Sequence, residues 1–188
     1  MKRIYTIVIL ACFFGTASAQ HEFDKWIFGN GLGIDFTSGT ATPFTSTINA
    51  WDNAGSIADA NGNLLFYSEG LRIYDRNGAV MPHGSGLLAD TSGGQPATIV
   101  RKPGNENLYY VFTCPNFGGA NGLRYTIVDM TLNGGLGDVD TNNKNILFYT
   151  PTAEKRGPGV NANGYDILIL AHEWGTNTFR SYLLTANG

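Results

Sequence analysis

The sequence is poor in charged residues, in cysteine and in basic clusters. Only 14% of its 188 residues are Asp, Glu, Lys or Arg, and two are cysteines. Cys12 lies in an N-terminal apolar run that we expect to be removed, which leaves Cys114 alone and excludes an internal disulfide. An acidic chain without a cluster of Lys or Arg is a poor nucleic-acid binder. We interpret Cys114 as a buried structural thiol, because no histidine follows at a spacing that suggests a catalytic pair.

Long apolar stretches are also absent beyond the N-terminus, and no apolar stripe recurs at helical spacing. The N-terminus itself has a basic start at residues 1–3, an apolar run at 4–15 and small residues at 17–19. This order predicts a secretory signal peptide over residues 1–19, cleaved before Gln20. A membrane anchor is the alternative, but the apolar run is short for crossing a bilayer.

The remaining domain, residues 20–188, is therefore expected to be secreted or displayed at the cell surface, with no membrane insertion after cleavage. The chain has 12 basic and 15 acidic residues, and the signal peptide contains two of the basic residues and none of the acidic ones. The exported domain thus has 10 basic and 15 acidic residues, a formal net charge of −5.

Glycine, in contrast, is abundant, with 25 residues. Glycine is costly inside helices and strands but suits tight turns, so many turns between short apolar runs predict an all-β protein. The tripeptide Ala-Asn-Gly occurs four times, starting at residues 60, 120, 162 and 186. Asn-Gly favours the tight turns of β-hairpins, and each copy lies beside a strand-like run. We therefore expect these tripeptides to mark recurrent hairpin turns.

A unit of two apolar runs and a turn recurs three times, over residues 63–78, 107–134 and 165–188. The first apolar runs at 64–67, 108–113 and 167–170 are apolar on both faces. A strand with one face in water would alternate apolar and polar residues, so these strands are expected to be covered on both sides. A β-propeller achieves this by radial repetition of four-stranded sheets. The alternative is a β-sandwich or a plain meander, in which the middle strands would have a wet face.

We therefore predict an all-β fold, a partial β-propeller of antiparallel four-stranded blades. Three copies are too few to close a ring of four to eight blades, so we expect the chain to be a fragment of a longer protein. The expected elements are inner strands near 56–58 and 97–101, outer strands at 79–81 and 146–149, loops at 115–121 and 133–144, and the outer strands of an incomplete first blade at 26–36 and 42–47.

Four phrases of the sequence resemble a known group of proteins. They are WIFGNGLGIDFTSG, ADANGNLLFYSEGLRIYDRNGAVMPHGSGLL, RYTIVDMTLNGGLGDV and AHEWGTNTFRSYLL. Together they resemble the N-terminal region of large exported proteins of Bacteroidota. In those proteins a propeller-like region is often followed by polycystic-kidney-disease-type immunoglobulin-like domains and by a C-terminal sorting domain for type IX secretion. The resemblance implies export to the cell surface or medium, and it supplies no catalytic residue.

His172, Glu173 and Trp174 form the first candidate for chemistry. A zinc protease motif needs a second histidine where Thr176 stands. Neighbouring residues of a strand also point to opposite faces, so His172 and Glu173 should not chelate one ion together. We favour a packing role for Trp174 at a loop edge over catalysis.

Oxygen-bearing side chains alternate at Asp59–Asn63 and at Asp138–Asn142, as in calcium loops. An EF-hand loop would need a glutamate where Gly70 or Tyr149 stands, so we favour turns in which the aspartates bind their own backbone. Calcium remains the weaker alternative, and a sialidase-type Asp-box match at residues 56–62 is off by one residue.

Carboxylates for glycoside hydrolysis must lie a few Å apart, and nothing in the sequence brings the available ones together. The glycine-rich segments lack the Lys-Ser/Thr of a phosphate loop. We therefore assign no catalytic, cofactor-binding or metal-binding residue. The available carboxylates are Glu69, Asp75 and Glu173.

These patterns favour an exported, non-catalytic binding or adhesion module whose partner is a glycan or a surface protein. Aromatic side chains could stack on sugars, although we expect most of them to pack between blades. The alternatives are a secreted glycan-active hydrolase and a structural spacer without a ligand. Two neighbouring carboxylates on the inner strands would favour the hydrolase, and a bare or aromatic-lined face would favour binding. The aromatic candidates are Trp26, Trp51, Tyr74 and Trp174.

Overall fold

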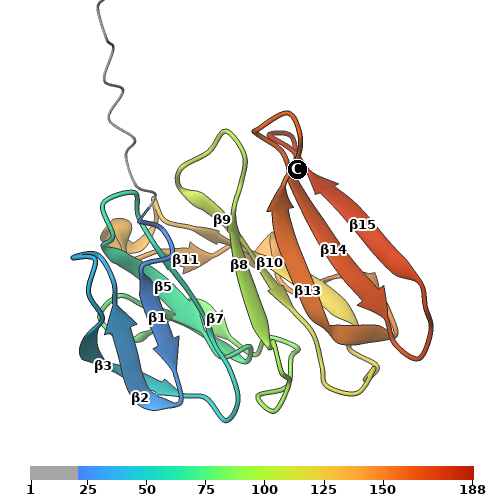
Figure 1. Ribbon diagram of the computed structural model, residues 1–188, viewed down its shortest axis with the longest axis horizontal. Coiled ribbons are helices and arrows are strands. Elements are labelled where there is room, and N and C mark those ends of the chain that lie inside the picture. Colours follow the sequence, from blue (N-terminus) through green and yellow to red (C-terminus); the bar gives the residue numbers. More distant parts are fainter. Residues whose placement is uncertain (1–20) are drawn as a thin grey trace, which may run out of the picture.

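The computed structural model describes residues 21–188, which form four antiparallel sheets in chain order (Figure 1). The predicted all-β class is confirmed, and the predicted signal peptide lies outside the described residues. The first sheet contains β1 (Lys25–Phe28), β2 (Asn30–Asp35) and β3 (Thr42–Asn49), and the second contains β4 (Gly55–Ala58), β5 (Leu64–Ser68), β6 (Arg72–Asp75) and β7 (Val80–Ser85). The third contains β8 (Ala97–Arg101), β9 (Leu108–Thr113), β10 (Leu123–Asp129), β11 (Asp138–Val139) and β12 (Ile146–Tyr149), and the fourth contains β13 (Thr152–Val160), β14 (Ile167–Glu173) and β15 (Phe179–Leu184).

Glycine-containing turns and loops join the strands of each sheet, as the glycine pattern predicts. The glycines of the four Ala-Asn-Gly tripeptides all adopt positive φ, between 66° and 108°. Side chains with a Cβ rarely adopt this conformation, which explains why glycine recurs there. Gly62 lies between β4 and β5, Gly122 between β9 and β10, and Gly164 between β13 and β14. The prediction that these tripeptides mark hairpin connections is confirmed for three of the four, and the fourth, at residues 186–188, forms a turn that no strand of the described chain follows.

Three sequence expectations need correction. Residues 26–36, expected as outer strands, form a hairpin in which Gly29 adopts a φ of +62°, and the first strand of this hairpin, β1, lies beside β4 of the second sheet. Residues 133–144, expected as a loop, contain two 3₁₀ turns and β11, because Val139 is buried and pairs with Val128 of β10. Only the second of the described sheets has four strands. The third has five, because both β11 and β12 pair with the same strand, β10. The first and fourth sheets have three strands each.

Each pair of successive sheets encloses its own apolar cluster. Ile27, Ile48 and Tyr67 pack between the first and second sheets. A second cluster fills the space between the second and third sheets, and a third cluster fills that between the third and fourth sheets. The main members of the second are Ile57, Phe66, Ile73, Tyr109, Val111 and Val128, and those of the third are Tyr110, Phe112, Leu123, Tyr149, Ile169 and Leu184.

Strands β5 and β9 therefore contribute to two clusters at once. Phe66 and Tyr67, neighbours in β5, point into different clusters. In β9, Tyr109 packs toward the second sheet and Tyr110 toward the fourth. The expectation that these two apolar runs are covered on both sides is confirmed, and it explains why neither alternates between apolar and polar residues.

The fourth sheet departs from this rule. Ile169 and Ala171 of β14 are buried against the third sheet, but Leu168 and Leu170 on the opposite face are 37% and 48% exposed. The expectation that residues 167–170 are covered on both sides is therefore wrong. The physical reason is that no sheet of the described chain packs on this outward face.

A matched pair of leucines tests the clusters. We expect Leu123→Ala to lower the free energy of unfolding by about 2–5 kcal/mol, because it opens a cavity at a fully buried side chain. Leu132→Ala, at an exposed turn position, should change it by less than about 0.5 kcal/mol. Urea denaturation followed by tyrosine and tryptophan fluorescence measures both values. Equal effects would contradict the assignment of Leu123 to a packed core.

Candidate functional site

The first strands of the four sheets line two adjacent pockets that share three lining residues, and we refer to the two together as the groove. One half, of about 300 Å³, is lined by β1, by residues 53–56 at the start of β4, by residues 95–99 of β8 and its approach, and by Pro158 of β13. The other half, of about 380 Å³, continues along β4, β8 and β13 to Tyr165. Phe23, Ile99 and Pro158 line both halves. Four strands that are distant in sequence thus meet along a common line.

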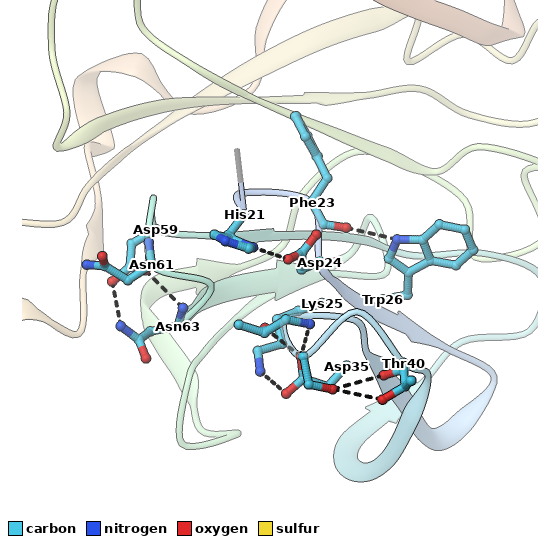
Figure 2. A network of polar contacts seen from close by, with 12 residues as sticks. His21, Phe23, Asp24, Lys25, Trp26, Asp35, Thr40, Asp59, Asn61 and Asn63 are labelled. Atoms are coloured by element: carbon cyan, nitrogen blue, oxygen red, sulfur yellow. Dashed lines mark hydrogen bonds and ion pairs between the residues drawn. The ribbon is translucent and has the colours of Figure 1, made fainter. Parts of the chain in front are cut away.

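Exposed aromatic side chains and uncharged polar side chains line the groove, together with aliphatic residues and the cations Lys25, Arg101 and Lys102. Phe23 and Tyr165 are largely exposed, and Trp26 is more than half exposed. The Trp26 indole Nε1 donates a hydrogen bond to the Phe23 carbonyl at 2.9 Å, which fixes the ring beside the groove (Figure 2). The polar contribution comes from Asn53, Gln95, Ser56 and Thr98.

Only one carboxylate lines the groove within the described residues. Glu22 lies 3.7 Å from Arg101 through its Oε1 atom. Its Oε2 atom is buried and finds no hydrogen-bond partner among residues 21–188. A glycosidase of the usual type needs two carboxyl groups flanking the scissile bond, and the groove presents one. This lining can hold a ligand by stacking and hydrogen bonding.

A larger cavity, of about 600 Å³, lies between the first and second sheets. Two of its three charged side chains pair with each other, since the Lys25 ammonium donates to the Asp35 carboxylate (Figure 2), and the third is Arg76. Lys25 and Asp35 are direct cross-strand partners in β1 and β2, so this ion pair supports the register of the hairpin. We therefore place the candidate site in the groove, where exposed side chains of several sheets converge.

The first calcium-like segment is a turn that satisfies its own carboxylate, whereas the second begins in β11 (Asp138–Val139) and continues into a 3₁₀ turn. Asp59 accepts hydrogen bonds from the backbone N–H groups of Asn61 and Asn63 and from the Asn63 amide, all at 2.9 Å (Figure 2). Asp138 pairs with His83 Nδ1 at 2.9 Å, and Asp140 accepts from Asn142 N–H at the start of a 3₁₀ turn. The turn interpretation is therefore supported for Asp59 and Asp140 and is wrong for Asp138, because Asp138 lies in a strand and binds a histidine of another sheet. In the part of the chain from residue 21 onward, no three His, Cys, Asp or Glu side chains group as metal ligands would.

His172 and Glu173 point to opposite faces of β14, as predicted. The His172 ring packs against the Phe179 ring at a tilt of 32°, with ring centroids 4.7 Å apart. Glu173 instead accepts two hydrogen bonds from Arg180, at 2.7 and 3.1 Å. Trp174 packs over Gly118, where a Cβ would come within 2.4 Å of the indole. The packing role proposed for Trp174 is therefore supported.

The three available carboxylates do not form a pair. Glu69 is buried in the turn between β5 and β6, where Tyr74 Oη and Arg72 Nη1 donate to it at 3.3 Å. Asp75 closes the next turn by accepting from two backbone N–H groups, and Glu173 binds Arg180 in the fourth sheet.

The tryptophans correct one expectation. We expected most of the aromatic candidates to pack between blades, but Trp26, Trp51 and Trp174 are all exposed, and only Tyr74 is buried. Two of the three tryptophans lie in or next to tight turns, which the sheets do not cover. Trp51, at 83% exposure, does not line the groove.

Sequence reasoning also missed the buried Arg156, which joins the third and fourth sheets. Its guanidinium donates to Cys114 Sγ at 2.9 Å and to the Phe112 carbonyl at 2.8 Å. Within residues 21–188 no carboxylate forms an ion pair with it, and its Nε atom has no partner. Burial lowers the pKa of Arg156 and raises that of Cys114. Cys114 is free and buried, as predicted.

Comparison with known proteins identifies no relative of this chain. No protein-family model, no curated protein and no solved structure matches this chain.

Among residues 21–188 there is no helix with the length and apolar character needed to cross a lipid bilayer.

The Lys25–Asp35 pair predicts acid sensitivity. The hydrogen bonds from Lys25 and then from Thr37 lower the pKa of Asp35 from 3.8 to about 2. A carboxyl group with a lowered pKa in the folded state stabilises the fold above its ordinary pKa, and this contribution is lost as the pH falls from near 4 toward 2. Asp35→Asn should make the free energy of unfolding less dependent on pH in this range. Urea denaturation between these pH values measures it, and an unchanged slope would contradict the role of the pair.

The buried carboxyl group of Glu69 should give the opposite dependence of folding stability on pH. Burial, the largest effect, raises the pKa of its carboxyl group above the ordinary value of 4.5 despite hydrogen bonds from Arg72 and Tyr74. The folded state then binds the proton more tightly than the unfolded chain, so stability falls as the pH rises above 4.5. Glu69→Gln keeps an acceptor for Arg72 and Tyr74 and should remove this loss. The same denaturation series measures it, and a variant with the parent slope would show that Glu69 titrates normally.

Proposed function

We propose that the chain is an exported, non-catalytic binding module, that its four sheets are consecutive blades of a β-propeller, and that the groove receives its partner. Two features support the propeller interpretation. Each sheet packs on the next through an apolar cluster, and the first strands of all four sheets line one groove. Radial repetition of sheets produces both features, whereas a two-layer sandwich does not bring every first strand to a common line.

The lining of the groove is the observation that carries the binding function. Exposed Phe23 and Tyr165 offer aromatic faces, and Asn53 and Gln95 offer both donors and acceptors. Sugar rings present C–H groups on their faces and hydroxyl groups at their edges, which match such a lining. A glycan of the cell surface or of the medium is therefore the preferred partner, with a surface protein as the second possibility.

The lining also ranks binding above hydrolysis. A glycan hydrolase with an axial active site would need a second carboxylate near Glu22, and the described lining supplies Arg101 as its charged neighbour instead. Export rests on the predicted signal peptide at residues 1–19 and on the resemblance to exported Bacteroidota proteins.

A glycan array and a panel of soluble polysaccharides test the proposal. We expect binding to a defined class of glycan without release of reducing sugar. Phe23→Ala removes the aromatic ring that lines both halves of the groove, and it should weaken binding about tenfold, equivalent to 1.4 kcal/mol.

Trp51→Ala is the matched control, because Trp51 is an exposed aromatic residue outside the groove. It should leave binding unchanged. Equal losses in both variants, or no binding to any glycan, would contradict the proposed site. Release of reducing sugar would identify the hydrolase instead.

A further inference from the structure

One cation in the lining of the cavity between the first and second sheets has no partner. Lys25 and Asp35 bind each other there, whereas Arg76 forms no ion pair and no side-chain hydrogen bond within the described chain. Of the ten Lys and Arg side chains in this part of the sequence, only Arg76 and Lys102 lack such a contact. Asp59 is near enough to feel the charge of Arg76, but its carboxylate is already bound within its own turn. The exposed guanidinium of Arg76 is therefore available to an anion.

The turn that contains Arg76 is held in a fixed position against β3. Asp75 accepts hydrogen bonds from two backbone N–H groups of this turn, at 2.8 and 3.1 Å. Thr47 of β3 donates to the Gly78 carbonyl at 2.7 Å, and a Cβ at Gly78 would lie 2.6 Å from the Thr47 side chain. The Asn77 amide lines the cavity beside Arg76 and, among the described residues, forms no side-chain hydrogen bond. A fixed backbone thus presents two unused polar side chains, which lowers the entropic cost of binding a ligand.

The rest of the lining matches a sugar. Phe44 of β3 supplies an aromatic ring, which lies so close to Gly33 of β2 that a Cβ there would be 2.3 Å from the ring. The hydroxyl groups of Thr45 and Ser46 belong to the same lining. An aromatic face packs against the C–H groups of a sugar ring, and hydroxyl and amide groups bind its hydroxyls. The volume of about 600 Å³ lies within the range of small-molecule sites, about 300–1,000 Å³.

The charge of the lining selects among sugars. It contains two cations, Lys25 and Arg76, and one carboxylate, Asp35, so its formal charge is +1, whereas residues 20–188 together have a formal charge of −5. A guanidinium group presents a planar fork of donors that matches a carboxylate.

We propose that this cavity is a second binding site, for a sugar acid, in which Arg76 binds the carboxylate and Phe44 packs against the sugar ring. The site is separate from the groove, because Lys25 is the one residue that lines both. The inference therefore goes beyond the proposed glycan binding by the groove and does not depend on it.

Isothermal titration calorimetry of the purified chain with a disaccharide of galacturonic acid tests the site. We expect binding that the methyl ester of the same disaccharide loses, because the ester removes the charge that Arg76 recognises. Arg76→Gln should weaken binding of the acid about tenfold, since hydrogen bonds between charged groups are lost. Arg76→Lys keeps the charge without the planar fork, so its affinity should lie between the two.

Lys155→Gln is the matched control, because it makes the same change of net charge at an exposed cation of β13 that does not line the cavity. It should leave the affinity unchanged. Equal losses in Arg76→Gln and Lys155→Gln would overturn the proposal, since net charge alone would then explain binding. Equal affinity for the acid and its ester, or no binding of either, would overturn it too.

Two further arms test the sugar and the place of binding. Inorganic sulfate that binds as tightly as the disaccharide would overturn the proposal, because Arg76 would then hold any anion and the lining would not recognise a sugar. Phe23→Ala changes the groove and not the cavity. If Phe23→Ala abolished binding of the acid and Arg76→Gln did not, the acid would bind in the groove. The second site would then be wrong, although the proposed function of the groove would stand.

Discussion

The structure depends on one constraint, which is that the central strands carry apolar side chains on both faces. In β9, Val111 packs toward the second sheet and Phe112 toward the fourth. A strand of this composition is stable only where a sheet lies on each side, because exposing the side chains of either face would return large apolar surfaces to water. The row of sheets follows from this requirement. A single sheet with one wet face could not satisfy it.

The same constraint creates the groove. When successive sheets pack face to face along the chain, the first strand of each comes next to the first strand of its neighbour, as the hydrogen bond from Ser56 Oγ to the Lys25 carbonyl illustrates. The free edges of these strands face a common space. This position also explains why Pro158 is tolerated within β13, since its missing N–H lies at an edge without a further strand. Binding groups therefore come from segments that are distant in sequence.

The separation of these segments along the sequence determines which features could be predicted from it. The central strands and their turns were predictable, because apolar runs and Asn-Gly pairs are local signals. Strand β13 was not, since glycine, proline and charged residues resemble a loop, and its burial of Arg156 depends on Cys114 in another sheet. The groove could not be predicted either. Phe23, Asn53 and Gln95 form no motif in sequence and meet only through the packing of the sheets.

The exception in the fourth sheet follows from the same physics. Leu168, Leu170 and Leu183 are the residues that a covered face would use, yet they are partly exposed to water here. A sheet selected to face solvent would place polar residues at these positions, as antiparallel sheets with one wet face commonly do. Their apolar character therefore indicates that the functional form of the molecule covers them. The first sheet likewise leaves Leu32 exposed, so both ends of the row of sheets carry apolar side chains that no described sheet covers.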